Sequence, residues 1–196
     1  MNPSAEHALS LLYTPPMPGD VMARSDSFFI RAQLNLDDTS TFTPTNIDLG
    51  SFVDALGKTV MRIHNVSAQY FYGGNSDGRP ILAAANTSGM TQWQLTTQNQ
   101  SGIVLLDNRT LIASGSLVST NSGTPGVANE FSFATQDLDI APQHWTNGYL
   151  VAVESLQFAG VNATEFSDNC FVSIVLECTV ETMTSAAAMA LALSQQ

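Results

Sequence analysis

The chain has 196 residues, enough for one well-packed core, and 44% of them are hydrophobic. Only 12% are charged, about half of the usual ~25%, and uncharged polar residues take their place. The formal net charge is −11, from 17 acidic and 6 basic residues. Because nucleic-acid affinity comes largely from Lys and Arg, this balance argues against direct genome binding.

The sequence of the N-terminal region predicts an arm that lies outside the main fold. Residues 4–13 place Leu9, Leu12 and Tyr13 on one side of a short helix, and the prolines of 15–18 then favour an extended connector. No positively charged segment precedes a hydrophobic run, so the sequence predicts no signal peptide. No run approaches the ~18 apolar residues of a membrane span.

Alternation of apolar and polar residues predicts the first strand over 27–36 and a short strand over 46–49. Pro44 argues against a central strand between them. Residues 51–56 are typical of one or two helical turns, with Ser51 as N-cap and Gly57 as the stop.

The longest strand-like run is 59–72. Neither of its faces is uniformly apolar, which predicts a bulge or kink near residues 64–67. The Gly-Gly-Asn-Ser-Asp-Gly sequence at 73–78 is typical of a turn.

Later strands are expected over 91–97, 102–106, 109–118, 129–135 and 148–158. A short helical connector over 139–145 precedes the last of these. The clearest strand is 170–181, because alternate residues from Cys170 to Val180 are apolar and the other face is mostly polar. A helical tail over 184–193 ends the pattern.

Cys170 and Cys178 lie on the same face of that last strand. At about 3.3 Å per residue their Cα atoms should be ~26 Å apart, whereas a disulfide needs roughly 4.4–6.8 Å. We therefore expect two buried free thiols, which fits a reducing compartment.

The order of elements predicts an all-β fold, an antiparallel β-sandwich of jelly-roll type. It has about eight strands, short helical connectors and a short C-terminal helix. We expect one domain over 1–196, made of an N-terminal arm (1–26), the sandwich (27–181) and a C-terminal tail (182–196). Residues 186–193 are apolar nearly all round, so either the chain's own sandwich or a neighbouring subunit must cover them.

One catalytic pattern matches as text. Residues 74–78 fit G-x-S-x-G, in which Ser76 would be the nucleophile of an α/β-hydrolase and His144 its base. The chain lacks the parallel sheet and long crossover helices of that fold. A hairpin turn chosen for Gly, Asn and Asp is the favoured interpretation.

Candidate metal ligands are sparse. His7, His64 and His144 are far apart in sequence and lack ligand spacing. Asp37-Asp38 and Asp137-Leu138-Asp139 either bind calcium weakly at a subunit contact or form a solvated turn and a helix start. We predict no catalytic residue, no cofactor-binding residue, no metal ligand and no enzyme activity.

Two segments resemble coat proteins of small icosahedral viruses that have a single jelly roll. They are residues 46–66, from Asn-Ile-Asp-Leu-Gly to Arg-Ile-His-Asn-Val, and the closing strand 170–181 with its tail. The resemblance implies a self-assembling capsid subunit of the virion, made in the host cytoplasm, with other virion proteins as further partners. Many such coat proteins have a basic N-terminal arm, and this chain has none. Genome charge would then be neutralised by another protein, an internal membrane or cations.

A carbohydrate-binding or attachment module is the alternative. Trp93, Trp145, Tyr70 and Tyr72 would then form a stacking platform, unless these aromatic residues belong to the core.

Overall fold

The computed structural model describes residues 24–54, 58–74, 76–121, 133–136 and 145–195. The helix expected over 4–13 and the connector expected over 139–144 lie outside them. The elements within the described residues are β1 (Phe28–Leu36), β2 (Thr43–Asp48), β3 (Thr59–Tyr72), β4 (Ser88–Thr96), β5 (Leu111–Thr120), β6 (Phe133–Gln136), β7 (Tyr149–Val151), β8 (Ser155–Asn162), β9 (Cys170–Thr182) and α1 (Ser185–Ser194).

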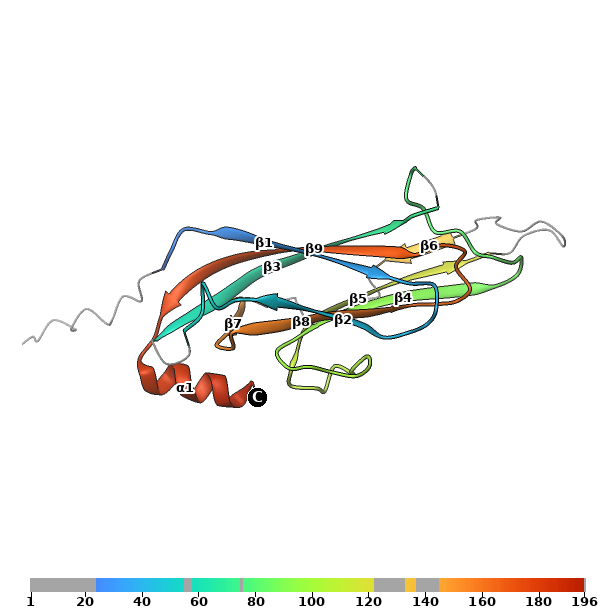
Figure 1. The fold of residues 1–196 in the computed structure, drawn as a ribbon. Helices are drawn as coiled ribbons and strands as arrows, with labels where there is room; N and C mark the ends of the chain where they lie inside the picture. The colour runs from blue at the N-terminus through green and yellow to red at the C-terminus, as the bar shows by residue number, and fades with distance from the viewer. Residues whose placement is uncertain (1–23, 55–57, 75, 122–132, 137–144, 196) are drawn as a thin grey trace, which may run out of the picture.

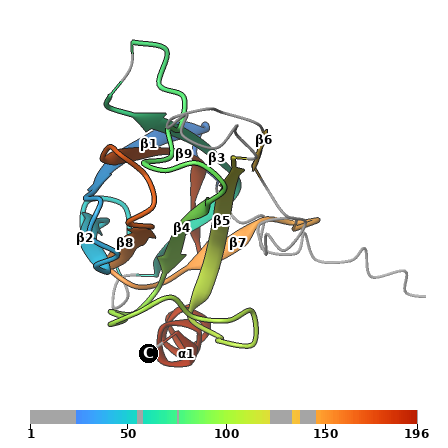
Figure 2. The same cartoon turned by 90° about the vertical axis from the view of Figure 1, so that its right-hand side faces the viewer.

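The strands form two antiparallel sheets that face each other (Figures 1 and 2). One sheet has the order β1-β9-β3-β7 and the other has the order β2-β8-β4-β5-β6. Apart from β6 and the β4–β5 hairpin, each strand is followed by one in the opposite sheet. This interleaving of eight strands is the jelly-roll arrangement, so the predicted all-β antiparallel sandwich is confirmed.

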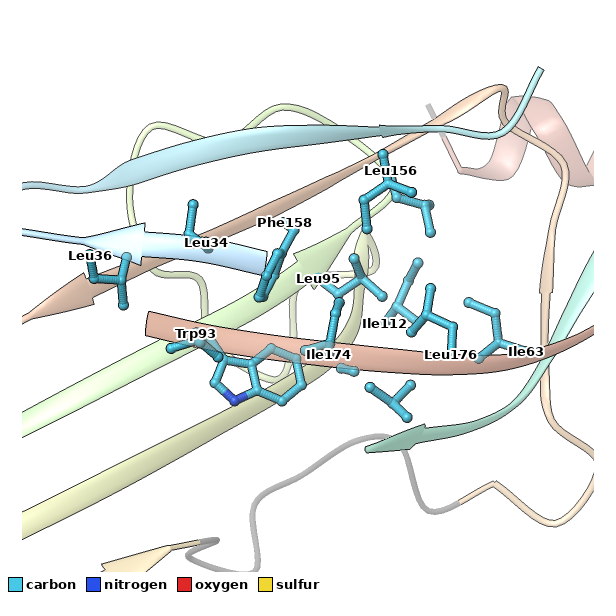
Figure 3. Packing of buried hydrophobic residues seen from close by; sticks show 14 of the residues in the cluster. Leu34, Leu36, Ile63, Trp93, Leu95, Ile112, Leu156, Phe158, Ile174 and Leu176 are labelled. Atoms are coloured by element: carbon cyan, nitrogen blue, oxygen red, sulfur yellow. The ribbon is translucent and has the colours of Figure 1, made fainter. Parts of the chain in front are cut away.

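The core lies between the two sheets (Figure 3). Leu34, Ile63 and Ile174 come from one sheet, and Leu95 and Phe158 come from the other. From Cys170 to Cys178 on β9 the inward residues are buried and alternate with half-buried ones, as the sequence predicts. Cys170 and Cys178 are buried and free. Burial raises the pKa of the Cys170 thiol to about 11. A buried thiol of this kind is unreactive and serves as a core side chain.

A bulge divides β3 at His64. Ile63 pairs with Cys178 and Asn65 pairs with Glu177, so His64 is the extra residue on the bulged strand. Met61 and Ile63 face the core before the bulge, and Val66 begins a new inward set after it. The predicted irregularity near residues 64–67 is therefore confirmed, and it explains why neither sequence face is uniformly apolar.

Two predicted strands differ in the structure. The run 148–158 forms two strands, β7 and β8, because the chain passes from one sheet to the other at residues 152–154. The run 102–106 is a loop with turns. Pro44 lies within β2, which pairs with β8 at the edge of its sheet, a position where the missing N–H of proline is tolerated.

The antiparallel strands sort the connections into two ends. The β1–β2, β3–β4 and β8–β9 loops lie at one end, and the β2–β3, β4–β5 and β7–β8 loops lie at the other together with α1 (Figure 1). Thr184 caps α1 by accepting a hydrogen bond from the Ala187 N–H. Ala188 and Ala192 pack against Val60 and Ala152, so the tail docks on its own sandwich.

Candidate contact surface

The β4–β5 loop, residues 97–110, is held against its sheet by two buried glutamines. The Gln157 side chain accepts a hydrogen bond from the Gln100 N–H at 2.7 Å and donates one to the Gln100 carbonyl at 3.3 Å. Gln94 accepts from the Val104 N–H at 2.8 Å and donates to the Gly102 carbonyl at 3.0 Å. Each side-chain amide accepts one hydrogen bond from the loop backbone and donates one to it, as the peptide groups of a neighbouring strand would. These four hydrogen bonds fix the shape of the loop.

This fixed loop presents leucines to solvent. The residue Leu105 is 75% exposed and Leu106 is 55% exposed. A loop whose backbone is anchored by four hydrogen bonds does not lose much conformational freedom on binding. Its apolar side chains are therefore already arranged for a contact.

A third glutamine anchors the end of α1 beside the same loop. Gln195 accepts a hydrogen bond from the Ala152 N–H at 2.9 Å and donates one to the Leu150 carbonyl at 2.6 Å. Its own carbonyl accepts from the Thr97 hydroxyl at 2.9 Å. The loop and the helix terminus are thus joined at one end of the sandwich.

The described part of the chain covers one side of α1. Ala188 and Ala192 are buried, whereas Met189 is 49% exposed and Leu193 is 64% exposed. Both views place the C-terminal end of α1 next to the β4–β5 loop (Figures 1 and 2). We call Leu105, Leu106, Met189 and Leu193 the apolar end surface. Exposed apolar side chains on anchored elements at the same end of the molecule are typical of a protein contact.

The glutamine anchors lead to a stability prediction. Gln157→Met keeps side-chain length but leaves the Gln100 N–H and carbonyl without their partner. We expect a loss of about 1–3 kcal/mol in the free energy of unfolding and faster proteolysis within residues 97–110. Urea denaturation and limited proteolysis measure these effects. The same change at the exposed Gln33 should leave both quantities near wild type.

A charged cluster lies on the outer face of the β1-β9-β3-β7 sheet. The Glu181 side chain is fully buried and accepts hydrogen bonds from Arg62 Nε at 2.7 Å and Arg62 Nη2 at 2.8 Å. Arg24 Nε lies 2.7 Å from the same carboxylate, and Arg62 Nη1 donates to the Asn147 carbonyl at 2.6 Å. The Arg62 hydrogen bonds hold the pKa of Glu181 below its usual value despite burial, which acts in the opposite direction.

The described residues do not bring Ser76 and His64 together in a catalytic arrangement. His64 lies at the β3 bulge, where its Nε2 is 2.9 Å from the Thr179 hydroxyl. Ser76 is in a turn, and the described residues after it form bends, turns and a β-bridge instead of the helix of a nucleophile elbow. His7 and His144 lie outside the described residues.

The proposed aromatic platform is divided between different places. Trp93 is buried in the core with its ring edge towards Phe158. Tyr72 is also buried, and its hydroxyl is hydrogen-bonded to Thr91. Trp145 is partly buried against Tyr149. The core interpretation is therefore correct for Trp93 and Tyr72, and these two residues are not available to a sugar.

The acidic candidates do not converge within the described part of the chain. Asp37 and Asp38 are exposed in the β1–β2 loop, where Asn169 Nδ2 donates to Asp37 Oδ1 at 3.4 Å. Asp137 and Asp139 lie outside the described residues. Among the residues that the structure places, no group of three or more His, Cys, Asp or Glu side chains is arranged to hold a metal.

The sequence does not predict the apolar end surface. Ile103, Val104, Leu105 and Leu106 form a continuous apolar run, which predicts a buried strand by composition. The signal for a loop is the turn sequence Asp107-Asn108 directly after it, where Asn108 binds the Thr110 N–H and hydroxyl. As for membranes, the described residues include no helix with the length and apolar character needed for a span.

No family model matches the sequence, and no curated protein matches it. Among solved structures, a chain of Desmodium yellow mottle tymovirus aligns with 86% of this chain and 92% of its own length. The sequence identity is 9% and the TM-score is 0.30. This is a weak structural resemblance to a viral protein.

Proposed function

We propose that this chain is a structural subunit that assembles with copies of itself into an icosahedral virion shell. The observation that carries the proposal is the apolar end surface. Leu105, Leu106, Met189 and Leu193 are exposed on elements that buried glutamines and alanines hold in place. The proposal assigns the chain no enzyme activity.

The low charge of the surface supports the same conclusion. A contact between subunits removes water from both surfaces, and an unpaired charge costs far more to dehydrate than a hydroxyl or an amide that finds a partner. The outward residues of the β1-β9-β3 sheet include Gln33, Ser173 and Gln69, which lie side by side in register. Such a face can be covered by a neighbour at low electrostatic cost.

The jelly roll supplies a suitable frame, although the fold alone does not determine function. Two sheets that share one core present loops at both ends and flat faces on both sides, and viral shells are among the uses of this architecture. In this proposal the chain is made in the host cytoplasm and resides in the virion with other virion proteins. The genome is neutralised by other components, because the chain has only 6 basic residues.

Replacing Leu105 with Asp should prevent or strongly weaken assembly. The exposed side chain makes few contacts in the isolated subunit, so the variant should fold, but it would bring an unpaired carboxylate into an apolar contact. We expect particles in the wild type and mainly dissociated subunits in the variant, as measured by sedimentation velocity and negative-stain microscopy.

The matched control is Asn99→Asp, which adds the same charge to the same loop at an exposed position without removing an apolar side chain. It should assemble nearly as the wild type does. A wild-type chain that stays monomeric at high concentration in several buffers would refute the proposal. Equal assembly of the wild type and Leu105→Asp would show that the apolar end surface is not a contact between subunits.

A further inference from the structure

The two arginines beside Glu181 form the wall of an open pocket. The pocket has a volume of about 580 Å³ and is lined by Arg24, Arg62, His64 and the residues Trp145–Gly148. Glu181 lies beneath the two guanidinium groups on β9, and residues 145–148 lead into β7 on the other side of β3. The pocket therefore lies over the outer face of the β9-β3-β7 sheet, opposite the core.

The charges around this pocket do not balance. Two guanidinium groups share one carboxylate, which leaves one positive charge at the pocket. The chain as a whole carries −11. Two of its 6 basic residues are thus concentrated in one hollow of a strongly acidic protein.

Arg24 has donors to spare. Its Nε is bound to Glu181, its side chain is 57% exposed, and its two terminal nitrogens have no hydrogen-bond partner among the described residues. The Nη pair of a guanidinium matches the two oxygens of a carboxylate in a bidentate geometry. Arg62, in contrast, uses Nε and both of its Nη atoms within the chain, so it positions the site and supplies charge.

We propose that this pocket binds an Asp or Glu carboxylate of a second copy of the chain, with Arg24 as the principal donor. The inference rests on the proposed self-assembly and names one of its contacts. Copies that each carry −11 repel one another, so an assembly gains from every place where an acidic side chain meets an exposed arginine. The pocket is such a place, and the 17 acidic residues of the chain supply the occupant.

Arg24→Gln tests the contact in the assembly. Loss of one partly exposed ion pair per subunit should raise the concentration at which particles form by about threefold to fivefold. It should also weaken the dependence of assembly on salt, because screening acts on that pair. The control Arg31→Gln removes the same charge from an exposed site on β1 and should assemble as the wild type does.

A second measurement uses dilute, unassembled subunits and propionate as the probe, with propionamide as its neutral counterpart. Propionate should saturably shift the NMR signals of Arg24 Nε–H and of the Asn147 and Gly148 amides, propionamide should not, and Arg24→Gln should abolish the shift. Wild-type particles together with unchanged assembly of Arg24→Gln would overturn the inference. Failure of the wild type to assemble would refute the proposed function. If propionate also caused no shift, the carboxylate site would be refuted as well.

Discussion

Replacing Ile174 with Asp should abolish folding. Ile174 is 1% exposed at the centre of β9 and lies in register between Ala32 of β1 and Ala68 of β3. Its side chain points between the sheets towards Trp93 and Leu95 (Figure 3). A carboxylate there has no partner, and its burial costs several kcal/mol, comparable to the whole stability of a domain, about 5–15 kcal/mol. Circular dichroism and dispersion of amide NMR signals measure the loss.

Two further variants show that the effect comes from the inward position. Ile174→Val removes one methyl group and should lower the free energy of unfolding by about 0.5–1.5 kcal/mol while the urea transition stays cooperative. Ser173→Asp places the charge on the outer face between Gln33 and Gln69, where a change within about 0.5 kcal/mol is expected. Comparable tolerance of Asp at 173 and 174 would mean that the two faces of β9 are assigned the wrong way round.

The sequence predicts the fold well where one face of a strand is dry. The strands 28–36 and 170–182 were predicted to within a residue or two at each end, because a period of two is unambiguous when alternate positions are all apolar. The division of 148–158 was not predicted. Leu150 faces α1 on the outside of the sheet and is as apolar as the inward Val151. Because residues on both faces of β7 are apolar, the sequence pattern does not show where β7 ends and β8 begins.

The candidate sites were much harder to predict. Leu105 and Leu106 have the composition of a strand, whereas in the structure their loop is held by the pairing of Gln157 and Gln94 with its backbone. The alternation along 170–181 places Glu181 on the mostly polar face of β9, and its side chain lies on that outer face in the structure. Its burial depends on Arg62, 119 positions away in sequence, and on Arg24, which no local pattern connects to it.

Glu181→Gln should lower the free energy of unfolding by about 2–3 kcal/mol at neutral pH. The substitution keeps the shape of the side chain but replaces one carboxylate oxygen with an NH2 group, which cannot accept a hydrogen bond from Arg62. Arg62 is only 12% exposed, so its charge would lose its partner in a place with little access to water. Arg24 is open to solvent and adds little to this loss. Urea denaturation at pH 7 measures the difference.

The sign of the pH dependence follows from the pKa of Glu181, which lies below its ordinary value because Arg62 hydrogen-bonds the ionised form. A carboxylate of this kind stabilises the fold above its unfolded pKa of about 4.3, and the contribution is lost as pH falls through the folded pKa. The stability gap between wild type and Glu181→Gln should therefore be constant from about pH 7 to 5 and should shrink below about pH 4. Glu177→Gln, the same change on the same face of β9, should stay within about 0.5 kcal/mol of wild type at pH 7. A gap for Glu181→Gln that persists unchanged in acid would show that packing, and not the ion pair with Arg62, holds this end of the sheet.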